Sequence, residues 1–337
     1  MEGHDFRLLS AKYGANEAWA DVIDVVRPRI VSPFSQFGFG YWEFPDPCYG
    51  TAKCLVITFL YHGKEQVATV PEGKWASLLS EPKLPCPSLP ATMPPSGDPL
   101  VSVVMSSYHR SEQLGKTLDS LICQHDVPFE IVVVEDGFDG GLTKAVCDRY
   151  PPQLVRYFCR TDRPNVEFSI PTIPNNIAIR QARGKVLLIQ PAEIRHVTEG
   201  SILKLVQPVL SNPCISNFAS VSSLGEDGKH VCWIIHHELK PMPLYACQAV
   251  DRAAVMYLRG FDEDFVGYGF DDDDFSFRLQ CMGVGFMFSK DVVVEHQFHG
   301  QYSDMKEQCW KNGDLFRKKM KDEIPVRNVN REWGRLR

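Results

Sequence analysis

The chain has 337 residues, 44% hydrophobic and 23% charged, a composition typical of globular rather than disordered proteins, and its length suggests two domains. The formal net charge of -6 argues against a surface built for nucleic acid or an anionic membrane. No run reaches the ~20 consecutive apolar residues that span a bilayer, and residues 1–10 lack a signal-peptide pattern, so we expect no transmembrane segment.

The 11 cysteines are odd in number and include no C-x-x-C pair. This pattern is typical of reduced thiols, not of a zinc site or a disulfide framework. We therefore expect a cytoplasmic protein.

Residues 1–80 predict a small all-β domain, because the segments 6–12, 20–26 and 55–61 are rich in β-branched and aromatic residues and lack helical periodicity. They contain no catalytic constellation, so we expect a β-sandwich-like accessory domain that docks a partner. Residues 81–99 contain seven prolines, which predicts an extended linker before a second domain at 100–337.

From residue 100 onward, apolar strands alternate with helices. Strands are expected at 100–105, 131–134, 154–159 and 186–189, and helices at 111–122, 142–150 and 174–183. This alternation predicts a mostly parallel, Rossmann-like α/β sheet flanked by helices. Because ligands bind at the carboxyl ends of such strands, the loops that follow the four strands are the expected functional region.

Polar side chains follow the first two strands. The first loop offers hydroxyls, an aromatic face and a guanidinium, which suit a ribose, a base and phosphates; an ordinary polar loop is the alternative. These residues are Ser106, Ser107, Tyr108 and Arg110. Glu135 and Asp136 end a run of three valines, so they must emerge at the sheet edge, where a carboxylate can accept from ribose or a base; the alternative is a simple Asp-Gly turn.

Two later segments carry further candidates. Asn176 and Arg183 belong to the helix expected at 174–183, which can meet a diphosphate or be a solvated face. His296 follows an apolar strand, with His299 three residues on, and can bind a metal or a phosphate. Neither G-x-G-x-x-G after the first strand nor G-x-x-x-x-G-K-[ST] occurs, so we do not expect a Rossmann dehydrogenase or a P-loop enzyme.

The most unusual segment is the run Asp271–Asp274, which lies among six aromatic residues rather than among lysine, glutamate and serine. Four carboxylates in aromatic surroundings are unfavourable unless a cation, a transferred proton or sugar hydroxyls use them.

Together these segments resemble the family 2 glycosyltransferases, which have the GT-A fold. The resemblance covers about residues 100–300 and is carried by VSVVMSSYHR at 101–110, EIVVVEDG at 130–137, NIAIRQARG at 176–184 and GFDEDFVGYGFDDDDFSFRL at 260–279. The last segment is similar to one in chondroitin-synthase-like and polypeptide GalNAc-transferase-like enzymes. The resemblance implies an inverting transferase that moves a sugar from a nucleotide-sugar, with a UDP-sugar expected, to a hydroxyl of a glycan or protein acceptor.

For the donor, the resemblance implies that Ser107, Tyr108 and Arg110 line the nucleotide site and that Asp136, with Glu135, holds the base and ribose. With the other strand-end and helix residues, the predicted donor-binding set is Ser106, Ser107, Tyr108, Arg110, Glu135, Asp136, Asn176, Arg183 and Gln190.

For the chemistry, Asp272 matches the family's catalytic aspartate and would act as general base, with Asp271 in place of the preceding glutamate. Crowded carboxylates with aromatic neighbours raise the pKa of such a base, which suits work near neutral pH. Asp274 and Arg278 match the supporting acidic and basic positions. The expected acceptor-binding residues are Trp233, Tyr268, Gly269 and Asp274, with core packing as the alternative for the aromatic residues.

The chain departs from the family at the metal motif. An Asp-x-Asp after the fourth strand normally binds Mg or Mn on the donor diphosphate, whereas this chain has Gln190-Pro191-Ala192-Glu193. Glu193 would be the single acidic ligand, assisted by His296 and diphosphate oxygens. The incomplete motif leaves a non-catalytic nucleotide- or carbohydrate-binding module as the alternative function. A nucleotidyltransferase would need a glycine-rich loop after the first strand, which is absent.

Overall fold

The computed structural model describes residues 6–27, 30, 37–38, 44, 47, 51–61, 63–71, 75–76, 78, 99–124, 126–163, 170–300, 306–321 and 325–336. The linker predicted at 81–99 lies outside these residues, except for Pro99. The chain forms two compact units. One comprises Met1–Cys86 and Gln280–Phe286, and the other Pro87–Leu279 and Met287–Arg337.

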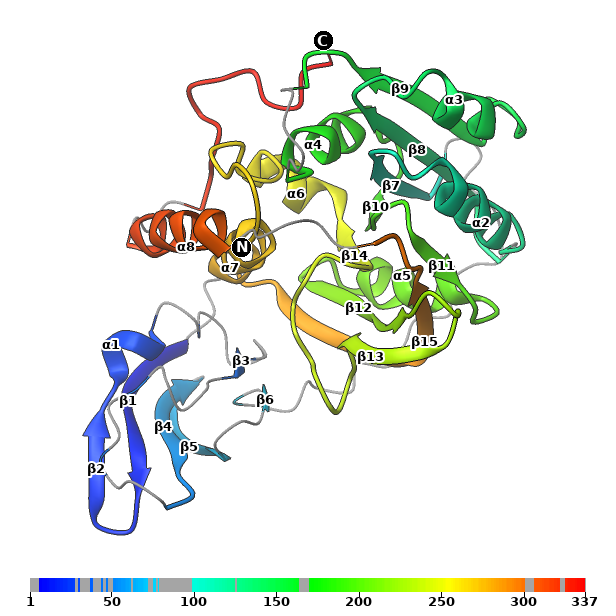
Figure 1. Ribbon diagram of the computed structural model, residues 1–337. Helices are drawn as coiled ribbons and strands as arrows, with labels where there is room; N and C mark the ends of the chain where they lie inside the picture. The colour runs from blue at the N-terminus through cyan, green and yellow to red at the C-terminus, as the bar shows by residue number, and fades with distance from the viewer. Residues whose placement is uncertain are drawn as a thin grey trace. The chain divides into compact units, whose positions relative to one another are not determined.

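The N-terminal part is built on a four-stranded antiparallel sheet with the strand order β2-β1-β4-β5 (Figure 1). Its elements are β1 (Phe6–Ala15), β2 (Ala18–Asp21), α1 (Ile23–Val26), β3 (Phe37–Gly38), β4 (Cys54–Tyr61), β5 (Lys64–Pro71) and β6 (Trp75–Ala76). Alternate residues of β4, Leu55, Ile57 and Phe59, are buried, which explains why this apolar segment forms a strand with one face in the core.

Only the first part of the strand predicted at residues 20–26 is extended. Residues 20–21 belong to β2, but residues 23–26 form the short helix α1. The Asp21 carboxylate accepts from the Ile23 N–H at 3.1 Å, and this local hydrogen bond turns the chain out of the extended conformation. β-Propensity alone therefore misassigned the segment.

The second sheet has the strand order β11-β15-β12-β14-β10-β7-β8-β9, with β13 paired to β12, and belongs to the larger unit except for the first two residues of β15. The strands are β7 (Val101–Ser107), β8 (Phe129–Asp136), β9 (Val155–Arg160), β10 (Val186–Ile189), β11 (Ile194–His196), β12 (Ile215–Leu224), β13 (His230–Ile235), β14 (Gln248–Asp251) and β15 (Gly285–His296). The helices are α2 (Ser111–Ile122), α3 (Leu142–Cys147), α4 (Thr172–Gln181), α5 (Ser201–Ser211), α6 (Arg252–Leu258), α7 (Asp271–Cys281) and α8 (Lys306–Met320).

The expected α/β architecture is present. Strands β10, β7, β8 and β9 are parallel neighbours, and each overlaps one of the four predicted strands. Beyond β10 the sheet continues with β14, which is antiparallel to both β10 and β12. Helix α4 packs on β7 and β8, and α5 packs on β10, β12 and β14. The core strands are apolar along their length because both faces of the sheet are covered.

Helix α4 ends at Gln181, two residues before the predicted end at residue 183. The Ser102 hydroxyl accepts from the backbone N–H of Arg183 at 3.2 Å and of Gly184 at 2.8 Å. A Cβ at Gly184 would lie 2.5 Å from the Ser102 backbone nitrogen, so only glycine allows this close approach to β7. No helix among the described residues is long and apolar enough to cross a membrane.

Candidate active site

The carboxyl ends of β7, β8 and β9 lie at one edge of the sheet. The parallel register pairs Ser107 with Glu135 and Asp136 with Arg160. The Ser107 hydroxyl is buried and has no hydrogen-bond partner among the described residues. A buried hydroxyl without a partner is unusual in a folded protein and is consistent with a ligand contact.

Asp136 is surrounded by cationic groups at this edge. Its carboxylate lies 2.9 Å from Arg160 Nη1 and 3.3 Å from Arg163 Nε. Burial raises the pKa of Asp136, while the two arginines act in the opposite direction. The Arg163 guanidinium also lies 3.6 Å from the centre of the Tyr108 ring. Sequence reasoning missed both arginines, although their place directly after a parallel strand was a usable signal.

Glu135 differs from its neighbour. Its buried carboxylate accepts from the Asp139 N–H at 2.5 Å and from the Tyr157 hydroxyl, and burial raises its pKa. Asp139 in turn accepts from Thr143 in the first turn of α3. The carboxylate of Glu135 therefore holds the loop between β8 and α3, rather than adding a second acceptor beside Asp136.

Gln190 is fully buried, and its side chain belongs to a network below the sheet edge. Its Oε1 lies 2.8 Å from His196 Nε2, and its Nε2 donates to the Ile194 carbonyl at 3.2 Å. His196 Nδ1 lies 2.7 Å from the Ser201 hydroxyl. These contacts occupy the amide, so the structure gives Gln190 a packing role in place of the predicted donor contact.

The same network leads to a pH prediction. Burial lowers the pKa of His196 from 6.5 to about 4, so the folded chain binds this proton more weakly than the unfolded chain does. The stabilising contribution is complete above pH ~6.5 and is lost as the pH falls towards 4, by about 1.4 kcal/mol per unit. An NMR titration should show the His196 ring neutral at pH 5. A midpoint near 6.5 would contradict this assignment, and His196→Gln should flatten the stability profile between pH 6.5 and 4.

Arg183 lies at the amino ends of β7 and β8, opposite the candidate edge. Its Nη2 is 2.7 Å from Glu130 Oε2, and Glu130 also accepts from Ser102 at 2.7 Å. Since Ser102 and Glu130 are register partners near the strand starts, the predicted donor contact of Arg183 is not supported by its position.

Asn176 and Asn175 have different surroundings on α4. The Asn176 amide donates to the Phe261 carbonyl at 2.9 Å and accepts from the Phe261 N–H at 2.7 Å, which ties α4 to the segment before α7. By contrast, neither atom of the buried Asn175 amide has a hydrogen bond of standard geometry within the described residues. Asn175 therefore fits a ligand contact better than the predicted Asn176 does.

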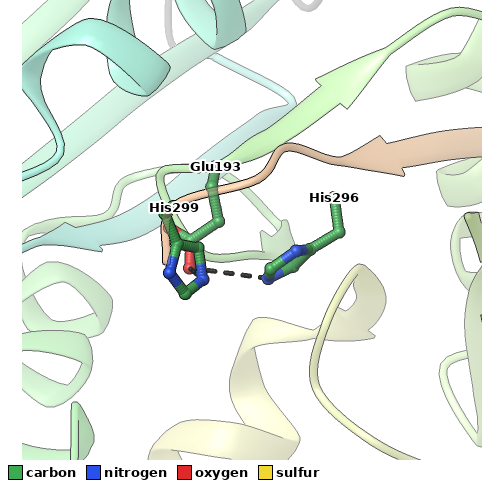
Figure 2. Close-up of side chains that lie close together, drawn as sticks. All are labelled: Glu193, His296 and His299. Atoms are coloured by element: carbon green, nitrogen blue, oxygen red, sulfur yellow. Dashed lines mark ion pairs between the residues drawn. The ribbon is translucent and has the colours of Figure 1, made fainter. Parts of the chain in front are cut away.

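Three side chains form a cluster suited to a metal ion (Figure 2). Glu193 Oε1 lies 3.7 Å from His296 Nε2 and 3.6 Å from His299 Nε2. One ligand atom from each residue lies within 4.8 Å of the others. Burial lowers the pKa of His296, which favours the neutral ring that coordinates metals. The sequence predicted Glu193 and one member of the His296/His299 pair, with His296 preferred, and in the structure both histidines lie near Glu193.

The cluster is assembled by sheet pairing. Strands β11 and β15 run antiparallel with Ile194 opposite His296, which brings Glu193, just before β11, to the end of β15. The Gln297 N–H then donates to the Glu193 carbonyl at 3.0 Å. This pairing of segments about 100 residues apart explains why the ligand set was only partly visible in the sequence.

The four aspartates form the first turn of α7, where carboxylates are favoured by the helix dipole. A loop of positive φ angles precedes them, 87° at Gly267, 87° at Gly269 and 69° at Phe270. On α8, the Asn312 amide donates to the Tyr268 and Gly269 carbonyls at 3.1 and 3.0 Å. Gly269 thus shapes the turn before α7.

The aspartates have different environments within this turn. Asp274 is fully buried and its Oδ2 lies 2.6 Å from Arg278 Nε, so its predicted acceptor contact is replaced by an internal ion pair. Asp273 is exposed, Asp271 is buried and Asp272 is intermediate. Burial, and then the adjacent Asp272 carboxylate, raise the pKa of Asp271 well above its usual value.

The carboxyl-terminal segment holds the loop that leads into α7. The Asn328 amide donates to the carbonyls of Arg259 and Phe261 at 2.9 and 2.8 Å. The Gly334 N–H donates to Glu263 Oε1 at 2.7 Å, and Asn176 donates to the same oxygen at 2.9 Å. The acidic turn is therefore positioned by contacts distant in sequence.

Tyr245 connects the metal cluster with the acidic turn. Burial raises its pKa well above the usual value, and the carboxylates of Asp271, Glu193 and Asp272 add to the shift, while Asn175 opposes it. These three carboxylates and the Asn175 amide therefore lie within electrostatic range of the Tyr245 phenol. Tyr245 precedes β14, whose Gln248 pairs with Ile189 at the end of β10, so the phenol belongs to the same sheet edge.

The two predicted acceptor aromatics lie in different places. Tyr268 is 45% exposed, and its pKa is raised by burial and then by the charge of Asp272, so it lies within electrostatic range of the proposed base. Trp233 lies on β13, its ring centre 4.9 Å from that of His230 and 4.6 Å from that of His236.

No protein-family model matches the chain, and no curated protein sequence matches it significantly. Among solved structures, its fold is similar to GalNAc-T7 with UDP, GalNAc and Mn2+, at 19% identity and TM-score 0.52 over 66% of this chain and 48% of that one. It is also similar to S. aureus TarS 1-349 in complex with UDP, at 16% identity and TM-score 0.51 over 68% of this chain and 66% of that one.

The chain thus spans about half the length of the GalNAc-T7 chain. At these identities the similarity concerns the fold. Taken with the observed sheet order, it shows that the chain has the GT-A fold of glycosyltransferases.

Proposed function

We propose that the chain is a nucleotide-sugar-dependent, inverting glycosyltransferase acting on a hydroxyl of a glycan or protein acceptor. The observation that carries the proposal is the meeting of two groups around Tyr245. Glu193 of the metal cluster and Asp271 and Asp272 of the first turn of α7 all act electrostatically on Tyr245, and each of them raises its pKa. The similar fold of GalNAc-T7, solved with UDP, GalNAc and Mn2+, supports the substrate class.

The ligand set fits a divalent cation. Glu193, His296 and His299 would hold it, and two imidazoles with one carboxylate favour a transition-metal ion such as Mn2+ over Mg2+, which prefers oxygen ligands. When bound, the cation would neutralise negative charge on the donor diphosphate. His299 would supply a second imidazole ligand, in compensation for the uncharged Gln190 at the position of the metal motif.

The nucleoside would bind at the ends of β7 and β8. We assign Ser107, Tyr108 and Asp136 to it, with Arg160 and Arg163 holding the Asp136 carboxylate in place. Ser106 and Arg110 lie on either side of Ser107 and Tyr108 in the sequence. Asn175, with its buried amide beside Tyr245, is placed to contact the transferred sugar.

In the transfer, Asp272 would take the proton of the acceptor hydroxyl as that oxygen attacks the anomeric carbon and the nucleotide leaves from the opposite side. Tyr268, beside Asp272, would contact the acceptor. Burial and the adjacent Asp272 carboxylate raise the pKa of Asp271, which favours the protonated form of Asp271 beside the proposed base.

The experiment that tests this function is a screen of sugar nucleotides for transfer, hydrolysis and binding, repeated with EDTA. We expect turnover of at least one donor, most readily a UDP-sugar, and its loss with EDTA. Nucleotide binding without any turnover would favour the alternative, a non-catalytic binding module, for which the neutral Gln190 is the supporting observation.

Replacing Glu193 by Gln should weaken Mn2+ binding more than about tenfold, because the variant loses the only charged member of the cluster. Mn2+ affinity measured by electron paramagnetic resonance checks this. Glu199→Gln is the matched control, since it removes the same charge from an exposed residue six positions away. Equal Mn2+ affinity in wild type and Glu193→Gln would place the metal elsewhere.

The role of the N-terminal domain and the cellular location are also proposals. Residues 1–80 would form an accessory domain that docks a partner. The cytoplasmic location rests on the cysteines, and no disulfide joins those that the structure describes.

A further inference from the structure

We propose that Arg110 and a metal ion compete for His299, so that metal binding releases the Arg110 guanidinium to bind an anionic ligand such as a nucleoside diphosphate. The inference rests on the metal site proposed above and not on transfer activity. It begins from one contact, in which Arg110 Nη2 lies 3.1 Å from His299 Nδ1.

The direction of this hydrogen bond is determined by chemistry. A guanidinium has only donors and keeps its protons in proteins, so Nδ1 of His299 must be the acceptor. The neutral ring then carries its single proton on Nε2. That nitrogen is the one 3.6 Å from Glu193 Oε1, so the N–H faces the carboxylate of the cluster.

A metal ion cannot join this arrangement unchanged. Coordination through Nε2 needs the lone pair of that nitrogen, so the ring proton must move to Nδ1, with no net proton gain or loss. The Nδ1–H would then face the N–H of Arg110, donor against donor, and bring a guanidinium next to a metal-bound ring. Coordination through Nδ1 would displace Arg110 directly. Either way, the Arg110–His299 contact and the metal exclude each other.

The position of His299 does not depend on Arg110. The Gln297 amide donates to the Gln113 carbonyl at 3.1 Å and to the Thr117 hydroxyl at 3.0 Å. Gln113 donates to the Phe298 carbonyl at 3.1 Å. Helix α2 therefore holds the turn that carries both histidines, and Arg110 can leave His299 without loss of the cluster.

The released guanidinium has a place to act. Arg110 directly precedes α2 and follows the residues at the end of β7 that are proposed to bind the nucleoside. An anion that binds the free guanidinium removes the competitor of the metal, so anion and metal should each raise the affinity for the other. Arg110 thus weakens metal binding when no anionic nucleotide is bound, and strengthens it when one is bound.

Mn2+ binding without nucleotide tests the competition. Arg110→Met removes the hydrogen-bond donor to His299 and should tighten Mn2+ binding roughly three- to tenfold, the equivalent of one hydrogen bond. Arg110→Lys keeps a cationic donor and should stay near wild type. Arg183→Met, a charge loss at the opposite sheet edge, is the control for long-range charge. With UDP present, the gain in Mn2+ affinity should be smaller in Arg110→Met than in wild type.

The ring proton supplies an independent readout. In 15N NMR of the full chain, with His299 identified by His299→Gln, Nδ1 should be unprotonated without metal and the coordinated ring should change when Zn2+ is added as a diamagnetic probe. Mn2+ affinity that is unchanged or weaker in Arg110→Met, or a protonated Nδ1 in the metal-free chain, would overturn the inference. Failure of Mn2+ and Zn2+ to bind wild type at all would instead overturn the proposed metal site, and the inference with it.

Discussion

Asp272→Asn should lower the rate of sugar transfer about 10²- to 10⁴-fold, the usual contribution of a general base. The amide cannot accept the acceptor's proton, while its size and its place in the first turn of α7 are kept. Nucleotide affinity should change little, because the residues assigned to the nucleoside lie at the ends of β7 and β8. Single-turnover rates and UDP binding by calorimetry measure the two quantities separately.

Asp273→Asn is the matched control for this variant. It removes a carboxylate from the adjacent position of the same turn, where the Asp273 side chain is exposed and Asp272 is half-buried. Partial desolvation and then the Asp272 charge raise the pKa of Asp273 to about 6, so the control also removes a charge that interacts with Asp272. We expect its transfer rate to stay within a few-fold of wild type. Full activity of Asp272→Asn, or an equal loss in both variants, would show that the base lies elsewhere.

Arg278→Met should lower the free energy of unfolding by about 3–5 kcal/mol, because it leaves the Asp274 carboxylate buried without its closest cation. Arg278 and Asp274 are both fully buried, with 2.6 Å between Nε and Oδ2. Arg278 Nη1 also donates to the Gly260 carbonyl at 2.9 Å, so the loop before α7 loses a contact as well. Urea unfolding measures the change.

The control for this variant is Arg335→Met. Arg335 lies 3.3 Å from Glu332, but both side chains are more than half exposed, so its loss should cost less than about 1 kcal/mol. A loss below about 1 kcal/mol for Arg278→Met would show that the internal pair is dispensable. In that case the supporting role assigned to Arg278 would be wrong.

The sequence by itself determined the parallel strands, their edge and the unusual acidic segment. Continuous apolar runs such as 131–134 predict strands buried on both faces, and polar residues that end them, Ser107 and Asp136, must emerge at the carboxyl edge. The four aspartates among aromatic residues indicated carboxylates in unusually apolar surroundings, and this too is visible in the local sequence. The signal depends on composition and on chain order, both of which are visible without tertiary contacts.

Only the tertiary structure separated residues of one type into different roles. Asp274 and Asp272 are two positions apart, yet one meets a buried arginine and the other stays accessible. The Asn176 amide is hydrogen-bonded to the Phe261 backbone, whereas the adjacent Asn175 amide interacts with the Tyr245 phenol.

The same holds for His299 and Tyr245, which enter the site through the pairing of β11 with β15 and of β10 with β14. Pairings and burial of this kind join residues from about 50 to 100 positions apart. The local sequence pattern shows which side chains are polar, but the partner that each side chain contacts is decided by how the strands pair in the sheet.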